Sequence, residues 1–190
     1  MQVLPTALPE VLEIVPKKHG DARGFFSEVY NAERFREAGI DFEWVQDNHA
    51  LSGQAGVLRA LHYQLPPVAQ DKLVRVARGR IFDVAVDIRK GSPRYGQWVG
   101  VELSAQRWNQ LFVPKGFLHG YVTLEPDTEV LYKVTAPYAP QYDRGVRFDD
   151  PDIGVIWPLA GLTPILSDKD RNAPLLRDAE NSFVYEVPAP

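Results

Sequence analysis

Short strand-like segments, separated by turn signals about every 8–12 residues, run through most of the chain and constrain its fold more than any other feature. Residues 82–88, FDVAVDI, alternate large apolar side chains with acidic or small ones, which is the period of a strand. Little of the chain shows the longer period of a helix, so a series of βαβ units is not expected. We therefore predict an all-β fold, an antiparallel jelly-roll sandwich or barrel with a few short helices at its ends.

Turn and capping residues indicate where the other elements begin and end. A strand is expected at 26–30, and a helix follows it, with Asn31 as its N-cap and Gly39 just beyond its C-terminus. Residues 125–127, EPD, are expected to form a hairpin turn between two strands. A short helix is expected after Ser167, running towards Ala179 and interrupted at Pro174.

Length and composition exclude several classes of protein. The chain has 190 residues, so residues 1–190 are predicted to form a single domain. It has no cysteine, which excludes disulfides and thiolate metal sites. Its net charge of −4 is scattered, which argues against a nucleic-acid partner. The first residues resemble no signal peptide and no run approaches the length of a membrane span, so we expect a cytoplasmic protein.

Residues 56–79 read as two strands joined by a Pro-Pro loop. Strict alternation would place Leu58, Ala60, His62 and Gln64 on one face of the first strand, and Val57, Leu61 and Tyr63 on the other. A histidine in apolar company is either a hydrogen-bonded core residue or a titrating group held out of water. The second face is also apolar, so we expect it to be covered; a partner subunit of a dimer is one candidate for that cover.

Two short motifs match those through which many cupin jelly rolls bind a metal ion. Gly56, five residues and His62 fit the start of the first motif, and residues 114–119, PKGFLH, fit the second. Gln64, however, stands where the first motif has its second histidine, and no glutamate follows in that stretch. Two ligands are fewer than a first-row metal generally needs. The sequence therefore predicts a cupin-type scaffold without a metal, with Lys72 in place of the carboxylate.

A larger set of motifs, in order along the chain, resembles the dTDP-4-dehydrorhamnose 3,5-epimerases. The motifs are DARGFFSEVY, QDNH, LRALHYQ, KLVRVARGRIFDVAVDIRKGSP, LFVPKGFLHGY, LYKVT, RFDDPDIGVIWPL and LSDKD. They span the chain from about Asp21 to Leu176. The resemblance implies a homodimeric, metal-free cupin enzyme without a cofactor, which acts on a nucleotide-linked 4-keto-6-deoxy sugar in dTDP-L-rhamnose synthesis.

The chemistry of such an epimerase can be matched to residues. A hydrogen on a carbon next to a ketone is weakly acidic, because the carbanion delocalises into an enolate. Inverting that carbon needs a base on one face, an acid on the other, and a donor at the developing oxyanion. His62 fits the base. The resemblance pairs it with Asp170, makes Tyr132 the acid and places Lys72 near the keto oxygen.

The resemblance also assigns contacts with the dTDP-sugar to ten further residues. They are Arg23 and Arg59 at the diphosphate, Glu28, Gln46, Asp47 and Asn48 at the nucleotide or sugar, Tyr138 stacked on the thymine ring, and His119, Asp143 and Lys169 at other ligand positions. Asp143 stands where the family usually has glutamate, and Pro137 replaces a residue that is commonly aromatic. Strand parity places Arg59 opposite His62, so either a bulge intervenes or Arg59 acts at the rim.

Three other functions fit parts of the sequence. A relative on the same scaffold that epimerises one carbon only, or moves the keto group, could keep all the catalytic residues. A metal-dependent cupin is disfavoured by Gln64 and Lys72. A module that only binds a sugar nucleotide would need neither a base nor an acid, whereas the chain retains both in His62 and Tyr132.

Overall fold

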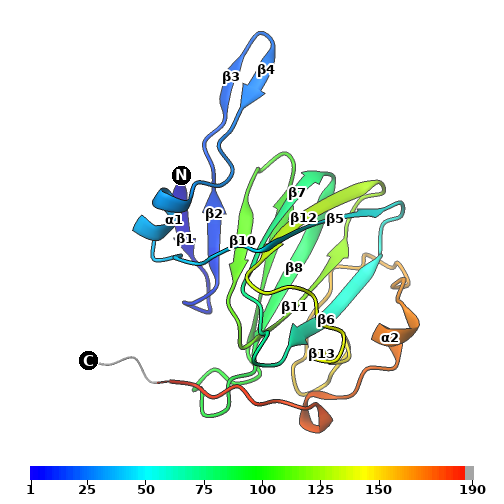
Figure 1. Cartoon of the computed structure of the whole chain (residues 1–190). Coiled ribbons are helices and arrows are strands. Elements are labelled where there is room, and N and C mark those ends of the chain that lie inside the picture. Colours follow the sequence, from blue (N-terminus) through cyan, green and yellow to red (C-terminus); the bar gives the residue numbers. More distant parts are fainter. Residues whose placement is uncertain (187–190) are drawn as a thin grey trace.

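The computed structural model describes residues 1–186, which form two antiparallel β-sheets packed against each other (Figure 1). The larger sheet consists, in spatial order, of β1 (Gln2–Pro5), β2 (Leu12–Val15), β10 (Gln110–Val113), β7 (Lys72–Arg78), β12 (Thr128–Val134) and β5 (Gln46–Ser52). The smaller sheet consists of β13 (Asp143–Gly145), β6 (Leu58–Gln64), β11 (Phe117–Thr123), β8 (Arg80–Asp87) and β9 (Trp98–Ser104). A hairpin of β3 (His19–Asp21) and β4 (Gly24–Phe26) extends away from both sheets. The single-domain prediction also covers residues 187–190, which lie outside the described residues.

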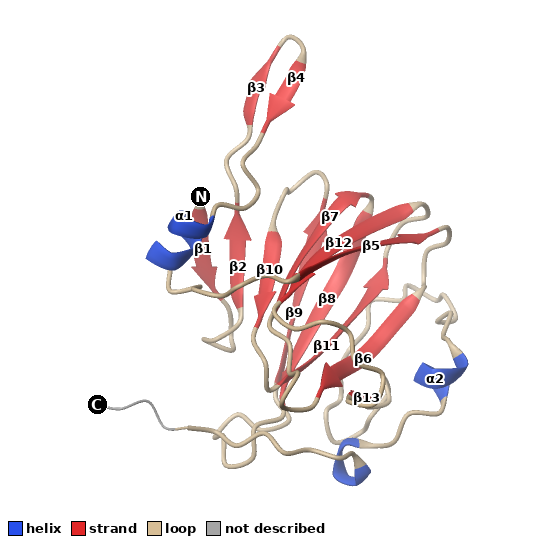
Figure 2. Cartoon of the chain, viewed as in Figure 1, coloured by secondary structure: helices blue, strands red, loops and turns tan. Residues whose placement is uncertain are grey.

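Residues 1–186 contain three short helical segments, α1 (Ala32–Glu37), α2 (Asp168–Arg171) and the 3₁₀ turn η1 (Leu176–Asp178) (Figure 2). The side chain of Asn31 accepts a hydrogen bond from the backbone N–H of Arg34 at 3.2 Å, and Gly39 follows α1 with φ of +81°, as the capping residues predict. The predicted all-β architecture with few short helices is confirmed. No helix in this part of the chain is long and apolar enough to cross a membrane.

Two local predictions are wrong. The turn at 125–127 closes no hairpin, because β11 pairs with β6 and β8 whereas β12 pairs with β5 and β7. It carries the chain from one sheet to the other instead. The strand expected at 26–30 ends at Phe26. The short helix predicted after Ser167 is present: α2 ends at Arg171 and helical structure resumes at η1 beyond Pro174, which has no amide hydrogen with which to continue a helix.

Apolar side chains cover both faces of the smaller sheet, and a third cluster, which includes Phe35 of α1, packs on the larger sheet. Between the sheets, Val74 and Val130 of the larger sheet pack with Ala85 of the smaller one. On the outer face, Leu61 and Tyr63 are buried in a cluster whose other members include Val146, Ile153, Trp157, Leu176 and Phe183. The prediction that this face is covered is therefore confirmed, and the C-terminal part of the same chain, not a partner subunit, covers it.

A β-bulge in β6 decides which of its side chains point between the sheets. His119 of β11 pairs with His62, but Tyr121, two residues further on, pairs with Arg59, three residues back. The extra residue in β6 reverses the alternation, so Arg59 and His62 lie on the same face of the sheet. Of the two alternatives that strand parity left for Arg59, a bulge in β6 is therefore the correct one.

The bulge depends on the glycine at position 120 of the neighbouring strand. A Cβ atom at Gly120 would lie 2.7 Å from Cβ of Ala60 and 2.8 Å from both Cα of Ala60 and the carbonyl oxygen of Arg59. Because backbone atoms cannot turn aside, only glycine fits there. Ala60 and Leu58 belong to the outer apolar layer. The prediction that they share a face with His62 is therefore wrong.

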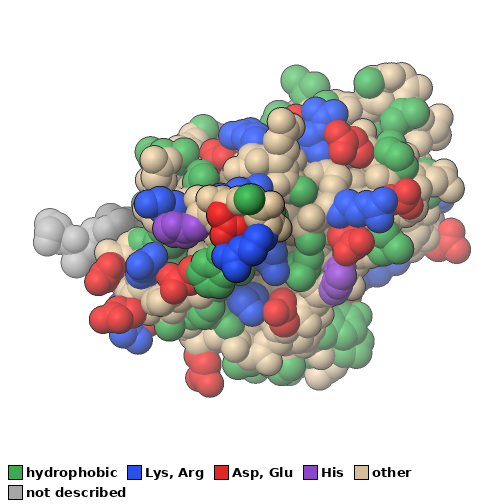
Figure 3. Space-filling model, turned by 90° about the horizontal axis from the view of Figure 1, so that it is seen from above, with side chains coloured by type: hydrophobic (Ala, Val, Ile, Leu, Met, Phe, Trp, Pro, Cys, Tyr) green, Lys and Arg blue, Asp and Glu red, His purple; other side chains and the backbone are tan. Residues whose placement is uncertain are grey.

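The surface mixes charges of both signs. Seen from above, basic and acidic side chains lie next to one another (Figure 3). Exposed ion pairs such as Arg23–Asp21 at 2.6 Å and Lys133–Asp47 at 2.9 Å are part of this pattern. It agrees with the scattered charge of the sequence.

Candidate active site

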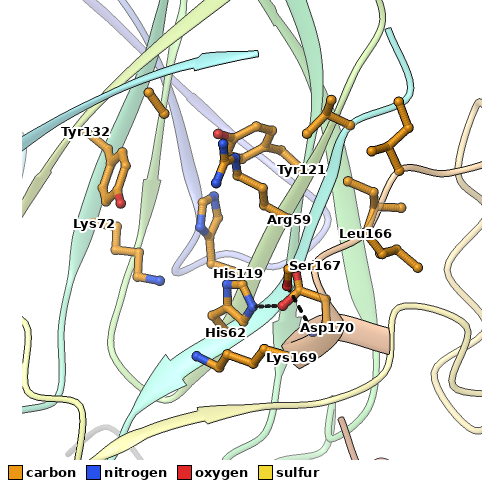
Figure 4. A pocket seen from close by; sticks show the side chains of 14 residues that line it. Arg59, His62, Lys72, His119, Tyr121, Tyr132, Leu166, Ser167, Lys169 and Asp170 are labelled. Carbon is orange, nitrogen blue, oxygen red and sulfur yellow. Dashed lines mark hydrogen bonds and ion pairs between the residues drawn. The ribbon is translucent and has the colours of Figure 1, made fainter. Parts of the chain in front are cut away.

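A cavity of about 420 Å³ lies between the two sheets, and titratable side chains line it (Figure 4). They are Arg59 and His62 from β6, His119 and Tyr121 from β11, Lys72 from β7, Tyr132 from β12, and Lys169 and Asp170 from α2. Strands β6 and β11 belong to the smaller sheet, and β7 and β12 to the larger one. Each sheet therefore contributes one wall of the cavity, and both walls carry titratable side chains.

His62 and Asp170 form a hydrogen-bonded pair on one wall. Nε2 of His62 lies 2.5 Å from Oδ1 of Asp170, although 108 residues separate the two in the chain. The backbone N–H of Asp170 donates to Oγ of Ser167 at 3.1 Å, and Ser167 thereby caps α2, the helix that carries this carboxylate. Because Nε2 is bonded to Asp170, the nitrogen that remains for a substrate proton is Nδ1.

The environment of Asp170 favours its charged form. Burial disfavours the charge and is the largest single influence, but the hydrogen bonds from His62 and Ser167 and the charges of His62 and Lys169 together lower the pKa of Asp170. A carboxylate in this position orients the imidazole and stabilises the imidazolium that forms when the ring takes a proton. The pair thus has the geometry of a general base with its orienting carboxylate.

Lys72, at the start of β7, presents an enclosed cation to the cavity. Burial lowers the pKa of Lys72 to about 8, although the negative charges of Asp143 and Asp83 oppose this shift. The side chain therefore still carries its proton at neutral pH. An ammonium group with little water around it stabilises a developing oxyanion more strongly than an exposed one would.

Tyr132 lies on β12, on the wall that faces His62. Burial raises the pKa of Tyr132, and the positive charge of Arg59 opposes that shift. The phenol therefore keeps its proton at neutral pH and can donate it. Figure 4 shows its hydroxyl directed into the cavity towards Lys72, with His62 on the opposite side. A base and an acid thus flank one space from two sheets.

Comparison with known proteins identifies the family. Residues 5–178 match the family model described as dTDP-4-dehydrorhamnose 3,5-epimerase. The dTDP-4-dehydrorhamnose 3,5-epimerase of Sinorhizobium fredii is 52% identical over 179 residues, which cover 94% of this chain and 91% of that protein. The chain belongs to the dTDP-4-dehydrorhamnose 3,5-epimerase family.

Solved structures of similar proteins agree with this assignment. A dTDP-6-deoxy-D-glucose-3,5-epimerase from Legionella pneumophila, in complex with dTDP-4-keto-L-rhamnose, has a TM-score of 0.94 and 44% identity, covering 98% of this chain and 99% of that one. ChmJ, a 3'-monoepimerase from Streptomyces bikiniensis in complex with dTDP-quinovose, has a TM-score of 0.86 and 37% identity, covering 91% and 87%. The cupin-type jelly roll predicted from the sequence is thereby confirmed.

The bulge in β6 turns the side chain of Arg59 towards the cavity. Its exposed side chain lies next to Tyr121 at the cavity wall in Figure 4. Tyr121 itself is buried, and its hydroxyl has no hydrogen-bond partner among residues 1–186. Burial raises the pKa of Tyr121 to about 12, so the phenol is neutral. Sequence analysis missed Tyr121, and the register that pairs it with Arg59 is the signal that would have found it.

Sequence analysis also missed Asp83 of β8. Its Oδ1 accepts a hydrogen bond from Nε2 of His119 at 2.7 Å, and the carboxylate is completely buried behind the cavity. The sequence does show an aspartate on the same strand face as the small Ala85. Without the second sheet on top of it, that face reads as polar and solvent-exposed.

Several other predicted contacts form a hydrogen-bonded chain beside the cavity. The backbone N–H of Tyr138 donates to Oε1 of Gln46 at 3.0 Å, and its hydroxyl donates to Oδ2 of Asp143 at 3.0 Å. Lys169 forms an ion pair with the same carboxylate. Gln46 also donates to Oδ1 of Asn48 at 2.8 Å. Of these five residues, Lys169 alone lines the cavity itself.

Gln64, which replaces a histidine of the metal-binding cupin motif, holds the loop that carries Tyr138. Its buried amide nitrogen donates to the carbonyl oxygens of Val68 at 2.8 Å and Pro137 at 3.1 Å, and its oxygen accepts from the backbone N–H of Ala139 at 2.8 Å. The amide is therefore fully engaged by the backbone. Within residues 1–186, no group of three or more His, Asp or Glu side chains could hold a metal ion.

The structure of one chain does not bring Arg23, Glu28 and Asp47 to the cavity. Arg23 lies at the tip of the β3–β4 hairpin, with 89% of its side chain exposed, and pairs with the neighbouring aspartate. Glu28 forms an ion pair beside α1. Asp47 pairs with Lys133 on the outer face of the larger sheet. Their contacts with a ligand remain predictions.

Proposed function

We propose that this chain inverts C3 and C5 of dTDP-4-dehydro-6-deoxy-D-glucose to give dTDP-4-dehydro-L-rhamnose. The observation that carries the proposal is the placement of the His62–Asp170 pair and of Tyr132 on opposite walls of one cavity, with Lys72 beside them. Membership of the 3,5-epimerase family supports the reaction. The dTDP-4-keto-L-rhamnose bound to the Legionella protein supports the class of ligand.

In the first step, Nδ1 of His62 takes the proton from a carbon next to the keto group. The electron pair of the broken C–H bond moves into a carbon–carbon double bond, and the keto oxygen becomes an enolate oxygen. Asp170 stabilises the imidazolium, and the Lys72 ammonium stabilises the enolate. A positioned donor at an oxyanion contributes about 3–4 kcal/mol to such a step.

In the second step, the enolate collapses and its electron pair takes the phenolic proton of Tyr132 on the opposite face of the carbon. The configuration is thereby inverted, and His62 and Tyr132 exchange protons with solvent before the next event. Positioned acid and base groups contribute typically ~10²–10⁴-fold each. The same two residues serve C3 and C5, because both carbons flank the C4 ketone.

The other predicted contacts fit the rest of the ligand. The guanidinium of Arg59, at the accessible side of the cavity, suits the diphosphate. Gln46, Asn48 and Tyr138 in the neighbouring hydrogen-bonded chain suit the nucleotide, since amides pair with a pyrimidine edge and a phenol ring stacks on it. His119 is assigned to the sugar.

We also expect a cytoplasmic homodimer that binds no nucleic acid. Phe25 and Phe26 on the extended hairpin are 53% and 71% exposed, and neighbouring exposed aromatic side chains are typical of a protein–protein contact. Sedimentation equilibrium should give about twice the chain mass of 21.4 kDa. A mass equal to that of one chain at micromolar concentration would contradict the dimer.

An epimerase for one carbon only is the second candidate, favoured by the similarity to the ChmJ 3'-monoepimerase. Proton NMR of the dTDP-4-keto-6-deoxyglucose substrate, incubated in D₂O with chelator-treated protein, separates the two. We expect deuterium at both C3 and C5. Deuterium at one carbon would favour the second candidate, and no deuterium with the nucleotide still bound would refute the assignment of catalysis.

A further inference from the structure

The buried carboxylate of Asp83 takes no part in the proton transfers described above. It lies on β8 between Ile81 and Ala85, on the face that packs against the other sheet, and is 0% exposed. Its Oδ1 accepts the hydrogen bond from His119, and its Oδ2 has no partner within residues 1–186. Burying a carboxylate without a full set of partners is strongly unfavourable. Its presence here therefore calls for a reason other than stability.

Asp83 determines the chemical form of His119. An ionised carboxylate only accepts hydrogen bonds, so Nε2 of His119 must carry the hydrogen between them. Burial, together with the positive charge of Lys72, lowers the pKa of His119, although the Asp83 carboxylate opposes this shift. The ring is therefore neutral, with its single hydrogen on Nε2. Because the ring lines the cavity, the lone pair of Nδ1 is the group that it offers to a ligand.

The same carboxylate acts on Lys72 through its charge. Burial disfavours the ammonium form of Lys72 most strongly, Asp143 on β13 and then Asp83 on β8 favour it, and Lys169 on α2 disfavours it. The other titratable groups on the cavity wall are Arg59, His62, His119, Asp170, Tyr121 and Tyr132. Asp143 is already engaged by Lys169 and Tyr138, whereas Asp83 keeps an unpaired oxygen. Asp83 is thus the less neutralised of the two negative charges.

We propose that Asp83 is a positioning residue that holds His119 as a neutral hydrogen-bond acceptor for a hydroxyl group of the sugar and keeps Lys72 as the cation of the cavity. A protonated His119 would donate to the enolate oxygen and compete with Lys72 for it. Asp83 thereby gives the two side chains different roles: His119 accepts a hydrogen bond from a sugar hydroxyl, and Lys72 stabilises the enolate. The part of the proposal that concerns Lys72 rests on the proposed function.

Asp83→Asn tests the proposal, because asparagine has the same shape without the charge. Asp87→Asn is the matched control. Asp87 is also completely buried on β8, but it accepts hydrogen bonds from Arg89 at 2.6 and 2.9 Å and from Ser92 at 2.6 Å, outside the cavity.

The first measurement is the ¹⁵N NMR spectrum of the histidine rings at pH 7, which needs no turnover. We expect His119 to be neutral with its hydrogen on Nε2 in the unsubstituted protein and in Asp87→Asn. In Asp83→Asn a measurable fraction should carry the hydrogen on Nδ1. An imidazolium, or a hydrogen on Nδ1 in the unsubstituted protein, would overturn the role assigned to Asp83 at His119. This outcome does not depend on the identity of the substrate.

The second measurement is the pH profile of kcat/KM. Loss of a nearby opposite charge moves a pKa by about one unit or more, so the fall of activity at high pH should begin about one unit lower in Asp83→Asn. The melting temperature should stay the same or rise, because a buried charge is removed. A high-pH limb that coincides with that of Asp87→Asn would overturn the role of Asp83 at Lys72, even if double epimerisation has been demonstrated.

Discussion

The enclosure of Lys72 predicts opposite effects of a single substitution on stability and on activity. Burial lowers the pKa of this side chain from 10.5 to about 8. One pKa unit corresponds to about 1.36 kcal/mol, so keeping the ammonium charged inside the folded protein disfavours folding by roughly 3 kcal/mol at neutral pH. Methionine has a similar volume and no charge. Lys72→Met should therefore raise the free energy of unfolding at pH 7 by up to about 3 kcal/mol.

This gain should depend on pH in a defined direction. Below about pH 8 both the folded and the unfolded protein hold the Lys72 proton, and the whole penalty applies. Between about pH 8 and 10.5 the folded protein loses that proton while the unfolded chain keeps it, so the penalty shrinks as pH rises. Urea unfolding at pH 7 and pH 10 should accordingly show a larger advantage of Lys72→Met at pH 7.

Activity should change in the other direction. Without the ammonium the enolate oxygen loses its donor, and kcat for deuterium incorporation should fall about 10²–10³-fold. Lys169→Met is the control for stability, because that side chain is 52% exposed and paired with Asp143, so removing its charge should give no such gain. The reasoning is refuted if Lys72→Met is less stable than the unsubstituted protein at pH 7, or if it turns over at the normal rate.

Two further substitutions test the bulge and the choice of acid. Gly120→Ala should lower the free energy of unfolding by about 1–3 kcal/mol, since the added methyl group would lie 2.8 Å from backbone atoms. In the control Gly145→Ala the methyl group lies at an ordinary 3.5 Å from His62, so this variant should be tolerated. Equal denaturation midpoints for the two variants would contradict the tight packing at Gly120. Tyr132→Phe should reduce kcat about 10²–10⁴-fold, whereas Tyr121→Phe removes a hydroxyl without a partner in the described chain and should leave stability unchanged. If both tyrosine variants lose activity equally in the NMR assay, the assignment of the acid to Tyr132 is wrong.

Local patterns predicted most of the elements. The alternation at 82–88 corresponds to β8, and Asn31 and Gly39 bound α1, because alternation and capping depend only on neighbouring residues. Family motifs supplied the four expected catalytic residues, and the structure places all of them around one cavity. The sequence also predicted that an apolar face of β6 must be covered. It could not predict which segment covers it, because Ile153 and Leu176 come from far along the chain.

Residue types, periodicity and motifs, which the sequence by itself determines, were enough for the fold class and the family. Tertiary structure alone decided which side chains face one another. One extra residue in β6, accommodated by Gly120 on another strand, turns Arg59 to the side of His62, and no pattern within β6 reports it. The buried charge of Asp83 and the His62–Asp170 bond across 108 residues have the same origin. Burial and hydrogen bonding are set by neighbours in space, and strand pairing brings those neighbours from distant parts of the chain.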